Sequence, residues 1–398
     1  MPDHTLLQAC PRTLPSHHRP TVRPPFECIA LLLQGGGALG SYQAGVYEAL
    51  AEANLHPDWI AGISIGAINA ALIAGNAPGE RVAKLRCFWQ EVTANPLLDW
   101  AAGFDHAAAK GNIARGVFNQ MSAVSALVGG APGFFVPRHP APWLQPAGSL
   151  AATSYYETKL LKSTLERLVD FDRINSGEMR FSAGAVNVRT GNFVYFDNTT
   201  RKIHPEHVMA SGSLPPGFPA VEIEGEHYWD GGLISNTPLQ WVVEGGPRQD
   251  TLAFQVDLWN ARGEFPSDLA SVATRQKEIQ YSSRTRANTD QFKQLQRLRY
   301  ALANLLEKLP ADLKDSKEAA LLRSVADHKV YNLVHLIYRS KRYESNSKDY
   351  EFSRLGMEEH WRTGYHDTVG ALRHREVLER PKNQEGVSIF DLARDGRE

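Results

Sequence analysis

One serine in this chain has neighbours suited to nucleophilic catalysis. Gly62-Ile63-Ser64-Ile65-Gly66 is a G-x-S-x-G pentapeptide, preceded by the apolar run 59–61 and followed by the helix-forming run 67–73. A sharp strand-to-helix turn of this kind exposes the serine Oγ and leaves the next backbone N–H free for an oxyanion. We therefore predict that Ser64 is a nucleophile on an elbow whose tight turn requires Gly62 and Gly66.

A glycine-rich segment precedes this elbow. Gly35, Gly37 and Gly40 spell G-x-G-x-x-G between an expected strand, 28–33, and an expected helix, 41–53. The spacing also fits a dinucleotide site, which needs a carboxylate at the end of the second strand. That strand ends in Ser64 instead. We therefore predict an oxyanion hole formed by the loop's N–H groups at Gly35, Gly36, Gly37 and Gly40. A plain tight turn is the alternative.

A base for Ser64 must accept its proton, and Asp230 has the sharpest setting. It ends an expected hairpin, 221–229, with Gly225 in the turn, and Gly231 and Gly232 follow it. The fourteen histidines lack a distinctive catalytic context; the best placed are His204, His207 and His227. A carboxylate on a turn can accept the proton directly, although its low intrinsic pKa predicts a weak base. A plain Asp-Gly-Gly turn is the alternative.

Three blocks together resemble the signature of the patatin-like phospholipase family: 34–40, 62–66 and 230–232, in this order. The stretch 210–219 resembles the family's segment before the catalytic aspartate. The resemblance covers roughly 29–258 and implies a three-layer α/β/α fold and a serine–aspartate dyad without histidine. It makes Ser64 the nucleophile, Asp230 its base, and the N–H groups of Gly36 and Gly37 with their neighbours the oxyanion hole. Acyl-ester hydrolysis through an acyl-enzyme, without cofactor or metal, is the implied chemistry.

One residue departs from the family pattern. Many members have Arg or Lys in the glycine-rich block where this chain has Leu39. The departure weakens any prediction of an anionic headgroup preference. Beyond about Ala261, the chain resembles the helical C-terminal extension of a bacterial subgroup of patatin-like proteins.

Composition and patterning divide the 398 residues into three parts. The net charge of −1 and the 42% apolar content indicate a globular protein without a nucleic-acid partner. We predict a disordered arm over 1–26, a catalytic domain over 27–261 and a helical extension over 262–398. Within the catalytic domain, 100–152 is a long insertion that is either a lid or a structural extension.

The expected extension contains two long helices, 268–309 and 321–341. A leucine stripe at helical spacing is expected to pack in the core: Leu295, Leu298, Leu302, Leu305, Leu306 and Leu309. Basic residues outnumber acidic ones over 262–382, which indicates either a solvated helical face or a docking face for anionic surfaces.

Targeting features are few. The proline-rich N-terminus has no apolar core of a signal peptide, and no stretch is long and apolar enough to span a membrane. Three cysteines at unrelated spacings indicate no disulfide framework. We predict a cytoplasmic protein that contacts lipid peripherally, on a membrane or granule surface.

These observations predict a serine acyl-ester hydrolase of the lipid acyl hydrolase or phospholipase type. An intracellular polyhydroxyalkanoate depolymerase is an alternative, because the ester chemistry is the same. A lipid- or granule-binding protein without activity is another, although binding alone needs neither Ser64 nor Asp230. An α/β-hydrolase with a Ser–Asp–His triad is a minor alternative, since such enzymes have several strands before the elbow. Phospholipid, neutral lipid, thioester and polyester substrates stay open.

Overall fold

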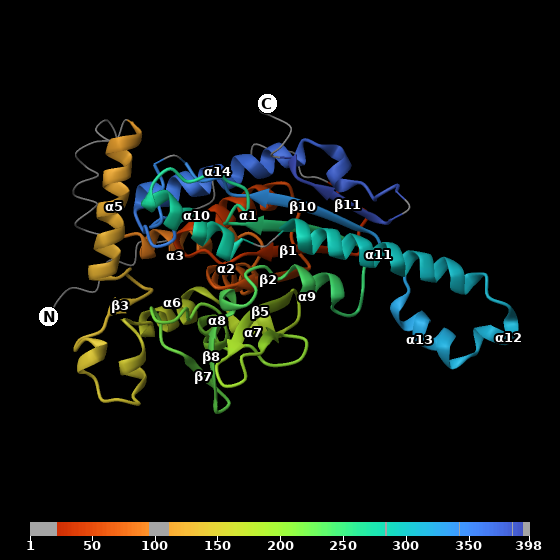
Figure 1. Cartoon of the computed structure of the whole chain (residues 1–398), viewed down its shortest axis with the longest axis horizontal. Helices are drawn as coiled ribbons and strands as arrows, with labels where there is room; N and C mark the ends of the chain where they lie inside the picture. Colours follow the sequence, from red (N-terminus) through yellow and green to blue (C-terminus); the bar gives the residue numbers. More distant parts are fainter. Residues whose placement is uncertain (1–21, 95–110, 283–284, 342, 384, 393–398) are drawn as a thin grey trace.

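The computed structural model describes residues 22–94, 111–282, 285–341, 343–383 and 385–392 (Figure 1). Within them, a nine-stranded sheet comprises β1 (Cys28–Leu33), β2 (Trp59–Ile63), β5 (Arg180–Asn187), β6 (Phe193–Asp197), β7 (Val221–Ile223), β8 (Glu226–Asp230), β9 (Thr251–Asp257), β10 (Tyr331–Ile337) and β11 (Val387–Phe390). A separate pair comprises β3 (Val136–Pro137) and β4 (Tyr156–Glu157).

The helices are α1 (Ser41–Glu52), α2 (Ile65–Ala74), α3 (Arg81–Val92), α5 (Asn112–Gly129), α6 (Lys159–Leu168), α7 (Phe171–Asn175), α8 (Pro205–Ser211), α9 (Leu239–Glu244), α10 (Leu269–Tyr281), α11 (Thr285–Glu307), α12 (Ala311–Lys314), α13 (Lys317–Val325) and α14 (Arg354–Leu372). None of these helices in the described ranges is both long and apolar enough to cross a membrane.

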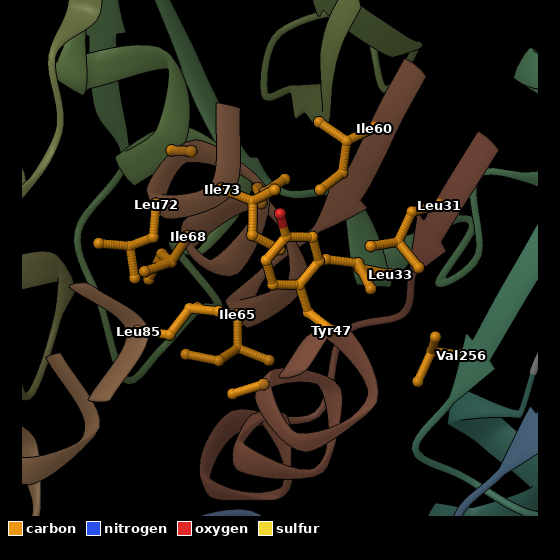
Figure 2. Close-up of a cluster of buried hydrophobic side chains, with 14 of the residues drawn as sticks. Leu31, Leu33, Tyr47, Ile60, Ile65, Ile68, Leu72, Ile73, Leu85 and Val256 are labelled. Atoms are coloured by element: carbon orange, nitrogen blue, oxygen red, sulfur yellow. The ribbon is translucent and has the colours of Figure 1, made fainter. Parts of the chain in front are cut away.

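The central sheet is mixed and covered on both faces. Its order is β11-β10-β9-β1-β2-β5-β8-β7, and the strands from β11 to β5 run parallel. Strand β1 is apolar throughout, as expected for a parallel strand buried on both sides. Its alternate residues Leu31 and Leu33 pack against α1, α2 and α3 (Figure 2), while Ala30 and Leu32 belong to a second cluster with α9. The predicted three-layer α/β/α fold is confirmed.

The C-terminal region is helical, as predicted, but it also extends the sheet. Strand β10 pairs with β9 over its whole length, and β11 pairs with β10. The predicted helix over 321–341 is therefore wrong: α13 ends at Val325 and β10 begins at Tyr331. The apolar run of β10 forms a strand because the open edge of β9 supplies its backbone partners. The predicted helix over 268–309 is two helices, α10 and α11.

Helix α14 joins the C-terminal region tightly to the catalytic core. A Cβ added to Gly45 of α1 would lie 1.9 Å from the carbonyl oxygen of Trp361, and one added to Gly364 would lie 2.0 Å from that of Tyr42. The two helices therefore cross with their backbones in close approach, which only glycine allows. The expected extension from residue 262 onward thus shares one core with the rest of the chain.

The leucine stripe of α11 does not enter the core, contrary to expectation. Its leucines are half-buried or exposed, and the buried positions among the described side chains are Thr289, Phe292, Gln296, Arg299 and Ala303. On this buried face Arg299 donates a hydrogen bond to the Val243 carbonyl oxygen, Gln296 donates one to the Lys329 carbonyl oxygen, and Phe292 packs in a hydrophobic cluster. Figure 1 shows α11 to α13 extending from one end of the molecule.

Two predicted boundaries fall partly outside the described residues. Of the expected N-terminal arm, only 22–26 is described, and there Phe26 is buried in the core. Of the expected insertion, 100–110 lies outside the described ranges. Cys28 is a buried free thiol.

Candidate active site

Ser64 sits at a strained turn between β2 and α2. Its φ of 56° and ψ of −126° place a non-glycine residue in a region that L-amino acids rarely adopt. The flanking glycines are needed for close packing: a Cβ on Gly62 would lie 2.3 Å from the Gly66 backbone, and one on Gly66 would lie 2.3 Å from the Leu33 carbonyl oxygen. The pentapeptide therefore forms the elbow geometry predicted from its spacing.

The sheet brings Ser64 and Asp230 together from opposite directions. Strand β2 runs parallel to β5 and ends with Ile63 opposite Gly184, while β8 runs antiparallel and ends with Asp230 opposite Ala185. Strands β2 and β8 pair with the same edge of β5, because β6 pairs with the other edge. The carboxyl ends of β2 and β8 therefore meet head-on, and this meeting places the serine beside the carboxylate.

The Asp230 carboxylate is buried and hydrogen-bonded. Its residue is 2% exposed, and its Oδ1 accepts a hydrogen bond from the Gly232 N–H at 2.7 Å. Burial raises the pKa of Asp230 from its ordinary value to about 7, against the lowering effect of hydrogen bonds from the Ser64 side chain and from Gly232. The expectation of a weak base with a low pKa is therefore wrong, because it left out desolvation.

The glycine-rich loop presents two unpaired N–H groups. Gly35 N–H donates to the Asn236 carbonyl oxygen at 3.3 Å, and Ala38 N–H donates to that of Asp349 at 2.8 Å. Between them, the N–H groups of Gly36 and Gly37 find no acceptor among the described residues. Gly37 has a φ of 56°, in the left-handed region that favours glycine. The loop can therefore offer two adjacent donors to an anion.

The remaining predicted glycines have close-packing environments. A Cβ on Gly40 would lie 2.5 Å from Ile65 Cγ1, and one on Gly231 would lie 2.7 Å from the Gly184 carbonyl oxygen. Gly40 does not line the cavity beside Ser64, whereas Gly35, Gly36 and Gly37 do. Gly40 thus contributes close packing against the first turn of α2.

A cavity of about 300 Å³ opens over Ser64 and Asp230. Its wall is largely apolar and aromatic, and no described lining residue is Lys, Arg or His. Phe134, Phe135, Phe218 and Phe352 form an aromatic cluster with ring centroids 5.2–6.0 Å apart. Leu127, Phe134 and Phe135 come from the predicted insertion. The wall suits an alkyl or acyl chain rather than a charged ligand.

The three best-placed histidines lie away from this wall. His204 and His207 cap the N-terminus of α8, where the Nδ1 of His207 accepts the His204 N–H at 2.9 Å. Burial lowers the pKa of His207 to about 4. His227 lies in β8 opposite Glu222. In the described part of the chain, no three His, Cys, Asp or Glu side chains are grouped so as to hold a metal ion.

Several positioning residues were not identified from sequence. Ser211 Oγ accepts the Ser64 N–H at 3.0 Å and donates to the Gly184 carbonyl oxygen at 2.6 Å, which ties the elbow to β5. The Gly35 carbonyl oxygen accepts hydrogen bonds from Trp259 Nε1 at 2.9 Å and Asn236 Nδ2 at 3.1 Å. Ser211 lies in the 210–219 stretch singled out above, but Asn236 and Trp259 have no local sequence signal.

Two family models match this chain. The model described as patatin-like phospholipase matches residues 31–243, and one described as patatin phospholipase matches residues 279–384. The first match covers more than half of the chain and includes Ser64, Asp230 and the glycine-rich loop. The chain belongs to the patatin-like phospholipase family, whose chemistry is the hydrolysis of lipid acyl esters.

Individual relatives are more distant. Lysophospholipase nte1 of Aspergillus terreus (strain NIH 2624 / FGSC A1156) is 48% identical over 60 residues, which are 15% of this chain and 4% of that protein. The match thus spans a small part of the fungal protein. VipD from Legionella pneumophila has a solved structure that aligns with a TM-score of 0.39 and 14% identity, over 94% of this chain and 76% of VipD.

Proposed function

We propose that this protein hydrolyses lipid acyl esters with a Ser64–Asp230 dyad and a covalent acyl-enzyme. The observation that carries the proposal is the buried Asp230 carboxylate, which accepts a hydrogen bond from the Ser64 side chain at the base of an apolar cavity. A pKa of about 7 suits a general base near neutral pH. No histidine is needed, and none lines the described cavity wall.

The reaction follows from these positions. Ser64 Oγ attacks the ester carbonyl carbon and passes its proton to Asp230, which gives a tetrahedral oxyanion. The N–H groups of Gly36 and Gly37, with that of Ile65 at the start of α2, bind the oxyanion. Gly35 does not contribute, because its N–H is already bonded to Asn236. Gly40 does not contribute either, because it lies outside the cavity wall. Protonated Asp230 then gives this proton to the leaving alcohol as the ester C–O bond breaks, which forms the acyl-enzyme. Water, deprotonated by Asp230, attacks the acyl carbon. The bond to Ser64 Oγ then breaks, and Ser64 Oγ takes the proton back from Asp230 as the acid leaves.

The cavity wall supports an uncharged acyl chain as the bound group. Aromatic and aliphatic side chains surround Ser64, and the charged lining residues are the acids Asp230 and Asp349. A wall without cations gives no charge pairing to an anionic headgroup beside the scissile ester. We expect neutral and zwitterionic lipids to be substrates, and a polyester oligomer is the second substrate to compare.

Peripheral contact with a lipid surface is part of the proposal. Helix α5 has its apolar side chains outward: Val117, Met121, Val124 and Val128 share one face and are each more than half exposed. On the opposite side of the helix Arg115, Asn119 and Ser122 are buried, and Arg115 pairs with Glu359 at 2.9 Å. This outward apolar face continues to Leu127 in the cavity wall, which supports a role of the insertion in lipid entry. A cytoplasmic location stays a prediction.

The nucleophile is tested by replacing Ser64. Ser64→Ala should abolish hydrolysis of a soluble p-nitrophenyl ester and of phosphatidylcholine while the protein stays folded, because only one oxygen is lost. A fluorophosphonate probe should label the wild type at Ser64 and nowhere else. Full activity in the alanine variant, or labelling at another residue, would overturn the proposal. If the wild type hydrolyses a hydroxyalkanoate oligomer but not phosphatidylcholine, the substrate is a polyester.

A further inference from the structure

The loop that carries the oxyanion donors is held by a segment far along the chain. We define the strap as residues 346–352, between β10 and α14. The Asp349 carbonyl oxygen of the strap accepts the Ala38 N–H at 2.8 Å. It packs so tightly on the loop that a Cβ on Gly37 would lie 2.1 Å away. The strap therefore bonds the N–H group of Ala38 and packs directly against Gly37, whose N–H group stays free.

An ion pair fixes the strap in turn. Lys277 Nζ of α10 lies 2.5 Å from Asp349 Oδ1 and also donates to the Asn346 carbonyl oxygen at 3.1 Å. The Asp349 side chain is 19% exposed, so the pair is shielded from water. Beside it, Lys348 Nζ, whose side chain is 2% exposed, lies 2.7 Å from Glu278 Oε1. Two consecutive residues of α10 thus pair with two consecutive residues of the strap.

The same contacts reach the other side of the loop through Trp259. Its indole N–H donates to the Gly35 carbonyl oxygen at 2.9 Å. Lys348 and Lys277 lie 5.1 and 5.8 Å from the centre of its ring, within range of a cation–π attraction. The loop is therefore held at Gly35 by Trp259 and at Ala38 by Asp349, and the two free N–H groups lie between these anchors.

We propose that Lys277 and Asp349 are positioning residues for the oxyanion hole, so that the catalytic geometry depends on the C-terminal region. The inference rests on the proposed function, because it assigns the loop an oxyanion. Neither residue falls in the stretch 31–243 that carries the nucleophile and its base. Tyr350 and Phe352 of the strap also line the cavity, so the same segment contributes to the acyl-chain wall. Desolvation raises the pKa of Asp349 and Lys277 lowers it, as expected for a carboxylate that needs its partner.

Breaking the ion pair should change transition-state stabilisation more than substrate binding. Losing one oxyanion donor costs about 10²–10³-fold in kcat, and a displaced donor should cost less. We expect Lys277→Met and Asp349→Asn each to lower kcat about 10–100-fold on a soluble p-nitrophenyl ester, with KM within about threefold of wild type. The rate constant of fluorophosphonate labelling should fall in parallel, because phosphonylation also develops charge on an oxygen in the hole. Lys277→Arg should restore most of both rates.

The design separates positioning from stability and from the proposed function. All rates are divided by the titrated concentration of active Ser64, and Glu358→Gln is the control, because it breaks the Arg86–Glu358 pair at 2.9 Å between α3 and α14 without reaching the loop. Its kcat should stay within twofold of wild type. If the wild type labels at Ser64 but Lys277→Met leaves kcat per active site unchanged, only this inference is overturned. A wild type that neither labels nor hydrolyses would overturn the proposed function as well.

Discussion

Two sides of the cavity are built by different means. We call the elbow at Ser64, the glycine-rich loop and Asp230 the floor, and α5 with Phe134 and Phe135 the roof. In the floor, backbone geometry does the positioning: Ser64 has a left-handed φ, and the glycines around it touch neighbouring carbonyl groups. In the roof, side chains form the surface: Phe134 and Phe135 line the cavity, while α5 turns Met121 and Val128 to the outside. Figure 1 places α5 at one side of the molecule, away from the α11–α13 end.

The difference indicates a division of labour. A floor fixed by hydrogen bonds and close packing can hold donors and a base without reorganisation, which is what transition-state stabilisation requires. A roof of apolar side chains can adapt to chains of different length and can contact an aggregated substrate. Changes in the floor should therefore reduce hydrolysis of every substrate, whereas changes in the roof should depend on the physical state of the substrate.

The largest effect is expected for the base. Asp230→Asn should lower kcat about 10³-fold or more on soluble and aggregated esters alike, because an amide cannot accept the Ser64 proton. In the wild type, kcat/KM should rise about tenfold per pH unit below the pKa of about 7 and level off above it, since only the ionised carboxylate is a base. Kinetics from pH 5 to 9 measure both. His204→Ala, His207→Ala and His227→Ala serve as controls and should keep most activity; loss in one of them would favour a triad.

The same substitution should increase stability. The folded-state pKa of Asp230 is raised to about 7, so the folded state binds its proton more tightly than the unfolded state does. The stability that this proton provides is present below the unfolded value near 3.9 and is lost as pH rises through about 7. At pH 8, Asp230→Asn removes the buried charge and should raise the free energy of unfolding by on the order of a few kcal/mol.

Chemical denaturation at pH 8 and pH 5 measures this gain. The stabilisation should be larger at pH 8 than at pH 5, because the wild-type carboxyl is already protonated at the lower pH. An equal effect at both values would show that the carboxylate is not desolvated as strongly as its burial indicates. Ser64→Ala serves as the comparison, because it leaves the carboxyl group in place.

Ser211 should have a smaller effect, confined to the floor. Ser211→Ala removes the hydroxyl that accepts the Ser64 N–H and leaves that N–H and the Gly184 carbonyl oxygen without this partner. We expect kcat per active site to fall about tenfold on soluble and aggregated esters equally, with little change in KM. Ser213→Ala is the matched control, because Ser213 Oγ bonds instead to the Met209 carbonyl oxygen of α8. Equal losses in both variants would point to a general disturbance of this segment.

The floor was largely predictable from sequence because its constraints are local. Gly62 and Gly66 lie within two residues of Ser64, so the pentapeptide alone predicts the turn that they permit. The pKa of Asp230 was not predictable, since it depends on burial by residues from several elements. The apolar residues of β10 fit the periods of both a helix and a strand, and pairing with the edge of β9 decides between them. Asp349 and Trp259 reach the loop only through the tertiary fold.

Substitutions in the roof should have the smallest effect on hydrolysis and the one most dependent on the substrate. Replacing Met121, Val124 and Val128 of α5 with glutamine should reduce hydrolysis of phosphatidylcholine vesicles about fivefold and leave a soluble short-chain ester within twofold, because the outward apolar face contacts the lipid surface and not the reacting atoms. Deleting 123–137 is a poorer test, since it would also remove the buried Phe134 and Phe135.

Leu321→Gln on α13, which is equally exposed and lies at the other end of the molecule, is the control. Vesicle co-sedimentation of the Ser64→Ala background measures binding without turnover. If the substituted helix lowers both activities equally, or if Leu321→Gln lowers vesicle hydrolysis as much, then α5 belongs to the structural wall of the cavity and the proposed lipid contact is wrong.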